Sequence, residues 1–360
     1  METKKILLLW APLADYSIAC LRELALRPNI ELSIIYQAGE SDAPYDQFDL
    51  SFCKSAQAYS KNKEKELFNF CVNLQPDVIL MSSWNYRFYM SVSKACRKMG
   101  TYVVSTFDGQ WAETIKQRVG ILTSAIFLKP CIDNFFVPGD RQANFARKLG
   151  YKNPFMGYYS ANTALFKDVQ ISQGENKFIF VGRLVHVKGI HYLMNAYKKY
   201  RESVSNPWGL ILCGKGELEH LCKGQEGVEI HGFTQPSQLP QRLASAKCFI
   251  LPSTFEPWGL VVHEAALAGL PIITSHKSGA STSYVRDGQN GYVVNPDEDS
   301  LLRAMKLISG ASDKKLAEMS QMSKSLGMMW TTEKWANYVH QYICNHEQLT
   351  ETKLSELKSA

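Results

Sequence analysis

The chain of 360 residues is long enough for two domains of ordinary size. Its content of 45% hydrophobic and 21% charged residues excludes a disordered chain, and no apolar run reaches the roughly 20 residues that a membrane-spanning helix needs. The formal net charge of +6 fits an anionic small substrate or surface better than duplex nucleic acid. The nine cysteines include no C-x-x-C pair and predict reduced thiols. We therefore expect a globular cytoplasmic protein that binds no nucleic acid.

Short apolar strands alternate with longer amphipathic stretches through the first half of the chain. This alternation predicts parallel strands joined by crossover helices. It ends at about residues 160–176, where the chain turns polar and loses apolar periodicity, and we place the domain linker there. The first domain is expected over residues 1–165. Its expected strands are Lys5–Trp10, Glu31–Tyr36, Asp77–Met81, Tyr102–Ser105 and Asn134–Val137.

The same alternation restarts after the linker and predicts a second doubly wound α/β domain over residues 166–332. Two such domains would face a central cleft lined by loops at the carboxyl ends of their strands. A C-terminal helix within about 333–360 is expected to pack back on the first domain. The strands expected in the second domain are Phe178–Val181, Gly209–Cys213, Val228–Ile230, Phe249–Leu251, Pro271–Thr274 and Tyr292–Val294.

The densest motif of the chain is PSTFEPWGLVVHEAALAGLP at 252–271, which follows a predicted buried strand and opens a helix. The amides of Gly259 and Leu260 would be unpaired donors at the start of that helix, where the helix dipole favours a phosphate. Glu256 lies just before them, and Glu264 lies about a turn and a half into the helix. Two carboxylates beside a phosphate site suit the recognition of sugar and ribose hydroxyls.

The second motif is FVGRLVHVKGI at 180–190, again a strand, a glycine-bearing loop and a helix. Arg183 and Lys188 flank this loop and could both reach one pyrophosphate, so that two fixed cations replace a divalent metal. The alternative is that these cations and the two glutamates are ordinary surface and helix-terminal charges, which their joint spacing disfavours. The acidic run Asp297-Glu298-Asp299 is interpreted as a capped helix start, so no metal site is expected.

The motifs V-G-R-L-x-x-x-K-G and E-x-x-G-L-x-x-x-E-A-x-A-x-G-x-P resemble those of the family 4 retaining glycosyltransferases of the GT-B fold. The resemblance covers about residues 177–297. It implies two Rossmann-like domains and transfer of a sugar, with retention of anomeric configuration and without a cofactor, from a nucleoside diphosphate sugar. A UDP-sugar is the expected donor. A glycan or a lipid-linked molecule is the expected acceptor, in the synthesis of a polysaccharide or glycoconjugate.

The resemblance also implies a role for each motif residue. Arg183 and Lys188 would hold the diphosphate, Glu256 the transferred sugar and Glu264 the ribose. The chain departs from the family pattern near Gly279, where a glutamate is often found, and its first loop, residues 11–16, is not glycine-rich. The further donor-binding residues that the resemblance implies are Gly182, Gly232, Phe233, Pro257, Trp258, Gly259 and Leu260.

Asp108, in S-T-F-D-G-Q-W, ends a predicted strand where the cleft is expected, and we treat it as a catalytic candidate that contacts the sugar or the acceptor. A turn-forming Asp-Gly pair explains this residue equally well. Asp15 follows the first predicted strand in a similar position, and a helix N-cap is the alternative there.

Two segments without acidic residues are candidates for contact with anionic lipid. The first, 78–107, combines Trp84, Tyr86, Phe88 and Tyr89 with Arg87, Lys94, Arg97 and Lys98; the second, 115–129, places Lys116, Arg118 and Lys129 around an apolar stretch. Either segment could place the protein at the inner face of the cytoplasmic membrane, near a lipid-linked acceptor. An ordinary solvated face is the alternative for both.

Two other functions are compatible with such a scaffold. A nucleotide-sugar epimerase or a phosphorylase would be an enzyme on the same fold, but the spacing of Glu256 and Glu264 argues against both. A non-catalytic sugar-nucleotide-binding subunit usually loses one of the four charged motif residues, and all four are present here.

Overall fold

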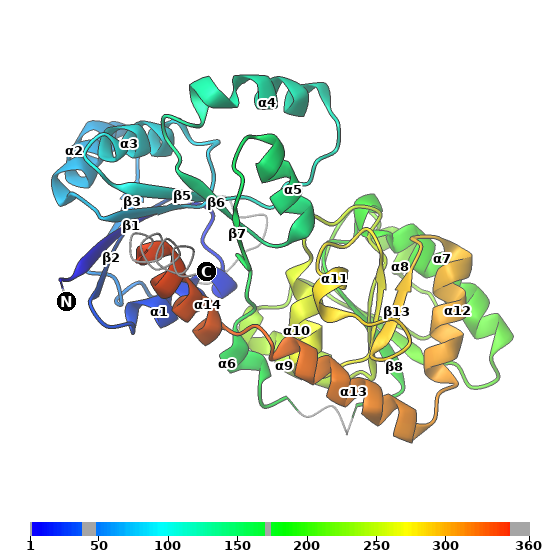
Figure 1. Cartoon of the computed structure of the whole chain (residues 1–360). Coiled ribbons are helices and arrows are strands. Elements are labelled where there is room, and N and C mark those ends of the chain that lie inside the picture. The colour runs from blue at the N-terminus through cyan, green and yellow to red at the C-terminus, as the bar shows by residue number, and fades with distance from the viewer. Residues whose placement is uncertain (1, 38–47, 170–173, 346–360) are drawn as a thin grey trace, which may run out of the picture. The chain divides into compact units, whose positions relative to one another are not determined.

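The computed structural model describes residues 2–37, 48–169 and 174–345. The chain divides into two compact units, of which unit 1 comprises Met1–Ser160 with Thr332–Ala360 and unit 2 comprises Ala161–Thr331. Each unit contains one parallel β-sheet with helices packed around it (Figure 1). The predicted α/β class with two Rossmann-like sheets is confirmed. Within the described ranges, no helix is long and apolar enough to cross a membrane.

The sheet of unit 1 has seven strands in the order β3-β2-β1-β4-β5-β6-β7. Five of these strands lie where they were predicted. The edge strands β3 and β7 were not predicted, because β3 has the sequence SAQAY with no buried residue and β7 is only two residues long. The strands are β1 (Lys4–Trp10), β2 (Ile30–Gln37), β3 (Ser55–Tyr59), β4 (Val78–Met81), β5 (Tyr102–Thr106), β6 (Asn134–Val137) and β7 (Phe155–Met156).

Helices on both faces bury the central strands of this sheet, which explains their nearly continuous apolar sequences. Trp335 of the C-terminal region is buried, and its indole N–H donates to the Tyr158 carbonyl (2.7 Å). Its helix, α14, contacts α1, so this segment belongs to unit 1. Residues 346–360 of the predicted C-terminal helix lie outside the described residues. The helical segments are α1 (Asp15–Ala25), η1 (Lys61–Lys63), α2 (Glu64–Leu74), α3 (Arg87–Arg97), α4 (Ile115–Phe127), α5 (Asp140–Lys148), α14 (Thr332–Tyr338) and η4 (Val339–Cys344).

The sheet of unit 2 has six strands in the order β10-β9-β8-β11-β12-β13. All six predicted strands are confirmed. They are β8 (Lys177–Val181), β9 (Gly209–Cys213), β10 (Val228–His231), β11 (Cys248–Leu251), β12 (Ile272–Ser275) and β13 (Gly291–Val294). The helical segments are α6 (Thr163–Phe166), η2 (His186–Lys188), α7 (Ile190–Ser203), α8 (Glu219–Cys222), η3 (Pro236–Gln238), α9 (Leu239–Ala244), α10 (Leu260–Ala268), α11 (Ser281–Tyr284), α12 (Glu298–Ser309) and α13 (Asp313–Gly327).

Unit 2 begins at Ala161 because the short helix α6 packs on α10 of the same unit. His263 of α10 is completely buried and joins both ends of the unit: its Nδ1 accepts from the Ala161 N–H (3.1 Å), and its Nε2 lies 3.0 Å from the Gly327 carbonyl. The stretch 170–173 of the predicted linker lies outside the described residues.

The candidate aromatic side chains of segment 78–107, one of the two candidates for contact with lipid, belong to the core of unit 1 or pack against it. Phe88 and Tyr89 of α3 are buried in the core of unit 1, and Trp84 packs on Phe107 and Phe135. The aromatic side chains of the segment therefore pack inward, and the Arg97 guanidinium forms an ion pair with Asp133 (2.7 Å).

Both sheets have a topological switch point. In unit 2 the chain runs from β8 outward to β10 and then crosses to β11 on the other side of β8; in unit 1 the corresponding break lies between β1 and β4. Open α/β sheets bind ligands beyond the carboxyl ends of the strands at such a break.

Candidate active site

The loops after β8 and β11 meet at the switch point of unit 2. The Val187 carbonyl accepts hydrogen bonds from the Thr254 N–H (2.9 Å) and from the Thr254 hydroxyl (3.2 Å). Gly189 of the loop after β8 has a φ of 73°, and a Cβ at this position would lie 2.2 Å from the Pro252 carbonyl oxygen. Only glycine allows this approach, which brings Lys188 to the loop that carries Glu256.

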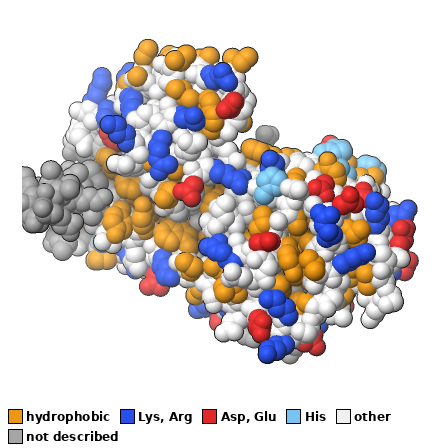
Figure 2. All heavy atoms as spheres, turned by 45° about the vertical axis from the view of Figure 1, so that its right-hand side comes forward, with side chains coloured by type: hydrophobic (Ala, Val, Ile, Leu, Met, Phe, Trp, Pro, Cys, Tyr) orange, Lys and Arg blue, Asp and Glu red, His pale blue; other side chains and the backbone are white. Residues whose placement is uncertain are grey.

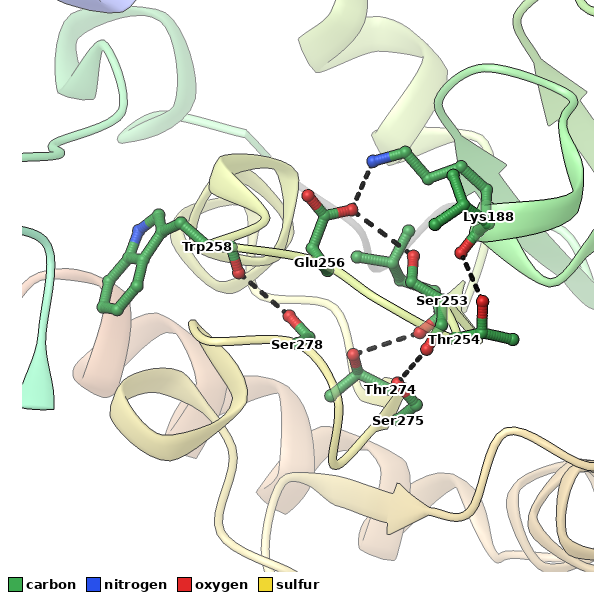
Figure 3. A network of polar contacts seen from close by, with 10 residues as sticks. Lys188, Ser253, Thr254, Glu256, Trp258, Thr274, Ser275 and Ser278 are labelled. Atoms are coloured by element: carbon green, nitrogen blue, oxygen red, sulfur yellow. Dashed lines mark hydrogen bonds and ion pairs between the residues drawn. The ribbon is translucent and has the colours of Figure 1, made fainter. Parts of the chain in front are cut away.

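Lys188 and Glu256 form an ion pair in this place, with their amine and carboxylate groups pointing toward each other (Figure 3). Their side chains are 18% and 10% exposed, so both charges are largely withdrawn from water. The Ser253 hydroxyl donates a further hydrogen bond to the Glu256 carboxylate (3.3 Å). The site thus contains a cation that could bind an anionic ligand. It also contains a carboxylate that could accept hydrogen bonds from sugar hydroxyls.

A second layer of hydrogen bonds fixes the loop that carries Glu256. The Thr274 hydroxyl donates to the Leu251 carbonyl (3.1 Å), and the Ser275 hydroxyl donates to the Ser253 carbonyl (Figure 3). The Glu256 N–H donates to the Lys277 carbonyl, and the Glu256 carbonyl accepts from the Gly279 N–H. Sequence reasoning did not identify Thr274 and Ser275, because they come from β12 and no local motif connects them with the loop.

Helix α10 (Leu260–Ala268) begins four residues after Glu256. Gly259 is its N-cap with φ of 90°, and a Cβ there would lie 2.9 Å from both the Glu256 Cγ and the Ser278 hydroxyl. Leu260 is the first residue of the helix, so the predicted phosphate-binding amides belong to the loop that carries Glu256. Glu264 lies in the second turn of α10 and is half-buried.

Trp258, predicted to bind the donor, is almost fully buried and points away from Glu256 (Figure 3). Its carbonyl accepts from the Ser278 hydroxyl (3.0 Å) and from the Ala280 N–H (2.8 Å). Gly279 lies against it, because a Cβ at this position would lie 2.3 Å from the Pro257 carbonyl oxygen. The structure therefore does not bring the Trp258 ring to the Lys188–Glu256 pair, and Pro257 and Trp258 form a packed corner beside it.

Arg183 is exposed on the loop after β8, next to Gly182. The turn after β9 supports this loop: the Leu184 N–H donates to the Lys215 carbonyl (2.8 Å). Cβ atoms at Gly214 and Gly216 would lie 1.9 Å from the Gly182 carbonyl oxygen and 2.3 Å from that of Leu184. Glycine is thus required at both positions of this G-K-G turn, so that its backbone can pack against the loop that carries Arg183.

Gly232 and Phe233, two of the expected donor-binding residues, follow β10 at the same edge of the sheet. A Cβ at Gly232 would lie 2.9 Å from the Lys215 Cε. The exposed Lys215 therefore places a third basic side chain at this edge, beside Gly232. Sequence reasoning assigned no role to Lys215, because the G-K-G turn on its own is a weak signal.

Asp108 lies in a cavity of about 390 Å³ within unit 1. Its carboxylate accepts from the Tyr159 hydroxyl (3.1 Å), and its carbonyl accepts from the Gln142 amide (3.0 Å). Burial raises the pKa of Tyr16 and of Tyr159, so these phenols remain protonated donors. The cavity lies at the switch point of this sheet, because loops after β1 and β4 contribute to it. Its aromatic lining consists of Trp10, Tyr16, Trp84, Phe107, Phe145, Tyr158 and Tyr159.

The remaining acidic candidates lie at the N-termini of helices. Asp297 caps α12, where its carboxylate accepts from the Ser300 N–H (2.8 Å), and the capping interpretation of Asp297-Glu298-Asp299 is confirmed. Asp15 is the first residue of α1, and Ala14 is the N-cap. In the part of the chain that the structure describes, no group of three or more His, Cys, Asp and Glu side chains could hold a metal ion.

Solved structures of other proteins identify the fold of the whole chain. A glycosyltransferase from Rickettsia africae has a TM-score of 0.75 at 11% identity, covering 96% of this chain and 99% of that one. The Anabaena protein HepE, solved with UDP and glucose, has a TM-score of 0.72 at 14% identity, covering 95% and 100%. The fold is therefore GT-B, as the sequence resemblance implied.

Residues 162–325 match the model of the family described as glycosyl transferases group 1. An uncharacterized glycosyltransferase of Methanocaldococcus jannaschii is 34% identical over 142 residues, which are 36% of this chain and 35% of the relative. Spore coat protein SA of Bacillus subtilis is 27% identical over 190 residues, 48% of each chain. The chain thus spans between about a third and a half of the length of these curated relatives.

Proposed function

We propose that this protein is a retaining glycosyltransferase that moves a sugar from a nucleoside diphosphate donor, with UDP as the preferred nucleotide, to a hydroxyl of a glycan or lipid-linked acceptor. One observation carries the proposal: the Lys188–Glu256 pair lies at the switch point of a glycosyl transferases group 1 domain, at the start of α10. HepE, which shares the fold, was solved with UDP and glucose and supports the choice of nucleotide.

In the proposed reaction the bond between the anomeric carbon and the diphosphate oxygen breaks, and its electron pair remains on the diphosphate. Arg183 and Lys188 stabilise the added negative charge, together with the first amides of α10. The acceptor hydroxyl forms the new bond on the face that the diphosphate leaves. The proton of that hydroxyl passes to the departing diphosphate, so neither a protein nucleophile nor a metal ion is required.

The ion pair gives Lys188 and Glu256 linked roles. Without donor, the two side chains neutralise each other in a place with little access to water. A bound diphosphate would compete for the Lys188 ammonium and release the Glu256 carboxylate to accept from hydroxyls of the transferred sugar. Glu264 would bind the ribose from the second turn of α10.

The cavity of unit 1 is the proposed acceptor site. Its aromatic walls suit the apolar face of a sugar ring, and Asp108 provides a carboxylate that can accept from a sugar hydroxyl. The Tyr159 hydroxyl holds that carboxylate in position (3.1 Å).

The test follows release of nucleoside diphosphate from a panel of nucleotide sugars, with and without acceptor glycans, and determines the anomeric configuration of the product by NMR. We expect release that depends on the acceptor, with a UDP-sugar preferred and the configuration retained. A product of inverted configuration would overturn the retaining mechanism. Tight nucleotide binding without transfer to any acceptor would favour the non-catalytic alternative.

A further inference from the structure

Helix α4 of unit 1 exposes an apolar stripe. Ile115 and Leu122 are each 81% exposed, Ile126 is 70% exposed and Val119 is 52% exposed. These residues recur every three or four positions, so they lie on one side of the helix. Phe127, at the end of the helix, is 64% exposed as well.

The inner side of α4 combines polar side chains with Ile121, which packs against the core of unit 1. Ser124 is the buried residue of the helix, and its hydroxyl donates to the Leu149 carbonyl (3.0 Å). Gln117 lies at the inner side too, where its amide donates to the Gln110 carbonyl (2.7 Å). An amphipathic helix normally buries its apolar stripe against the core, whereas α4 directs most of its large apolar side chains to the surface.

Basic residues flank the stripe. On a helical projection Lys116 and Arg118 fall on opposite sides of it, and both are exposed. No acidic residue occurs between Glu113 and Asp133. Glu113 forms an ion pair with Arg118 (3.7 Å), but both side chains are largely exposed and such a pair is weak. The upper edge of unit 1, where Figure 1 places α4, shows hydrophobic side chains with basic ones beside them (Figure 2).

We propose that α4 binds the surface of a membrane that contains anionic lipids, with Ile115, Leu122 and Ile126 entering the boundary between headgroups and acyl chains. An apolar face with basic flanks is complementary to such a surface, and the two signals together give attachment without a spanning helix. A second copy of the chain fits less well, because it would bring the Lys116 and Arg118 side chains of two stripes together. This inference does not depend on the proposed transferase activity.

The experiment measures cosedimentation with vesicles made of equal parts phosphatidylcholine and phosphatidylglycerol, and with vesicles of phosphatidylcholine alone. We compare the wild type with a Leu122→Ser/Ile126→Ser variant. Leu26→Ser is the matched control, because Leu26 is 71% exposed in the same unit but lies outside α4. Thermal melting and sedimentation velocity of each protein report folding and self-association.

We expect the wild type to bind the anionic vesicles at low ionic strength and to be released by salt. The double variant should lose about ten-fold or more in vesicle affinity with an unchanged melting temperature, and Leu26→Ser should bind like the wild type. Absence of binding to anionic vesicles, or equal binding by the double variant, would overturn the proposal. A wild-type dimer that the double variant converts to a monomer would instead make the stripe an interface between copies.

Discussion

Lys188 and Glu256 are the residues on which the proposed chemistry depends most, and each is needed to balance the buried charge of the other. Removing one partner of a largely buried ion pair leaves an uncompensated charge. Their loops meet through Gly189 and Thr254, and these backbone contacts hold the two side chains within reach of each other. Their contribution to stability can therefore be measured separately from their contribution to turnover.

We predict that Lys188→Ala lowers the free energy of unfolding by about 3 kcal/mol, because it leaves the Glu256 carboxylate without a cation. The Lys188→Ala/Glu256→Ala double variant should recover a large part of that loss. Arg183→Ala should change stability by less than about 0.5 kcal/mol, since Arg183 is exposed. Urea unfolding of these proteins and of the Glu256→Ala single variant gives these values, and single costs that simply add in the double variant would contradict a coupled pair.

His263 is predicted to make the stability of the protein depend on pH. Burial lowers the pKa of this imidazole to about 4, below the ordinary value of about 6.5. The unfolded chain therefore binds the proton more readily than the folded one, and stability falls as pH decreases from about 6.5 to about 4. The loss should approach roughly 3 kcal/mol.

The His263→Leu variant provides the control for this prediction. It should be less stable at neutral pH, because the Ala161 N–H and the Gly327 carbonyl lose their partner. Its free energy of unfolding should change less between pH 7 and pH 5 than that of the wild type. The same pH dependence in both proteins would assign the effect to other groups.

Sequence reasoning named Lys188, Glu256 and Asp108 individually but not their partners. Lys188 and Glu256 lie in separate local motifs, and their pairing depends on the parallel contact of β8 with β11. The cavity around Asp108 was not predictable for the same reason, because Trp10, Trp84 and Tyr159 come from distant parts of the chain.

At the scale of elements, the turn after β9 should control the loop that carries Arg183. Gly216→Ala would place a Cβ 2.3 Å from the Leu184 carbonyl oxygen, so the loop must shift. We predict a loss of about 1–3 kcal/mol in stability and weaker binding of UDP. Gly120→Ala is the control, since a Cβ there meets nothing within 4 Å. Calorimetry with UDP and thermal melting check both variants, and equal behaviour of the two would contradict the role of this turn.

Helices α3 and α4 show what periodicity can and cannot predict. Both segments combine apolar and basic residues, and both were candidates for contact with lipid. In α3 the apolar side chains Phe88, Tyr89 and Val92 are buried, whereas in α4 Leu122 and Ile126 are exposed. A periodic pattern defines the apolar side of a helix but not whether the sheet or the solvent lies against it.

At the scale of the whole molecule, the repeated strand and helix pattern predicted two parallel sheets, and both are present. The pattern did not determine strand order, because pairing between strands is set by contacts far apart in sequence. The order places Lys188 and Glu256 at the switch point of one sheet and the Asp108 cavity at that of the other. Each unit therefore has one candidate binding site at the position where this class of sheet binds ligands.

In the proposed chemistry two cations, without a divalent metal, stabilise the departing diphosphate. We predict that the wild type releases nucleoside diphosphate at an unchanged rate in excess chelator. Arg183→Ala should lower kcat by about 10²–10³ with little change in donor affinity, because it removes a group that acts on charge formed in the transition state. Lys188→Ala should lower kcat in the same way, measured under conditions where thermal melting shows that the variant is folded. The loss of kcat in the Arg183→Ala/Lys188→Ala double variant should be smaller than the two single losses combined.

The most direct measurement is therefore the rate of nucleoside diphosphate release by the wild type, Arg183→Ala and Lys188→Ala proteins, each with excess chelator and with added Mg²⁺ or Mn²⁺. We expect full wild-type activity in chelator and a large loss of turnover in both variants. Wild-type activity that chelator abolishes and Mg²⁺ or Mn²⁺ restores, or near-normal turnover in both variants, would contradict it.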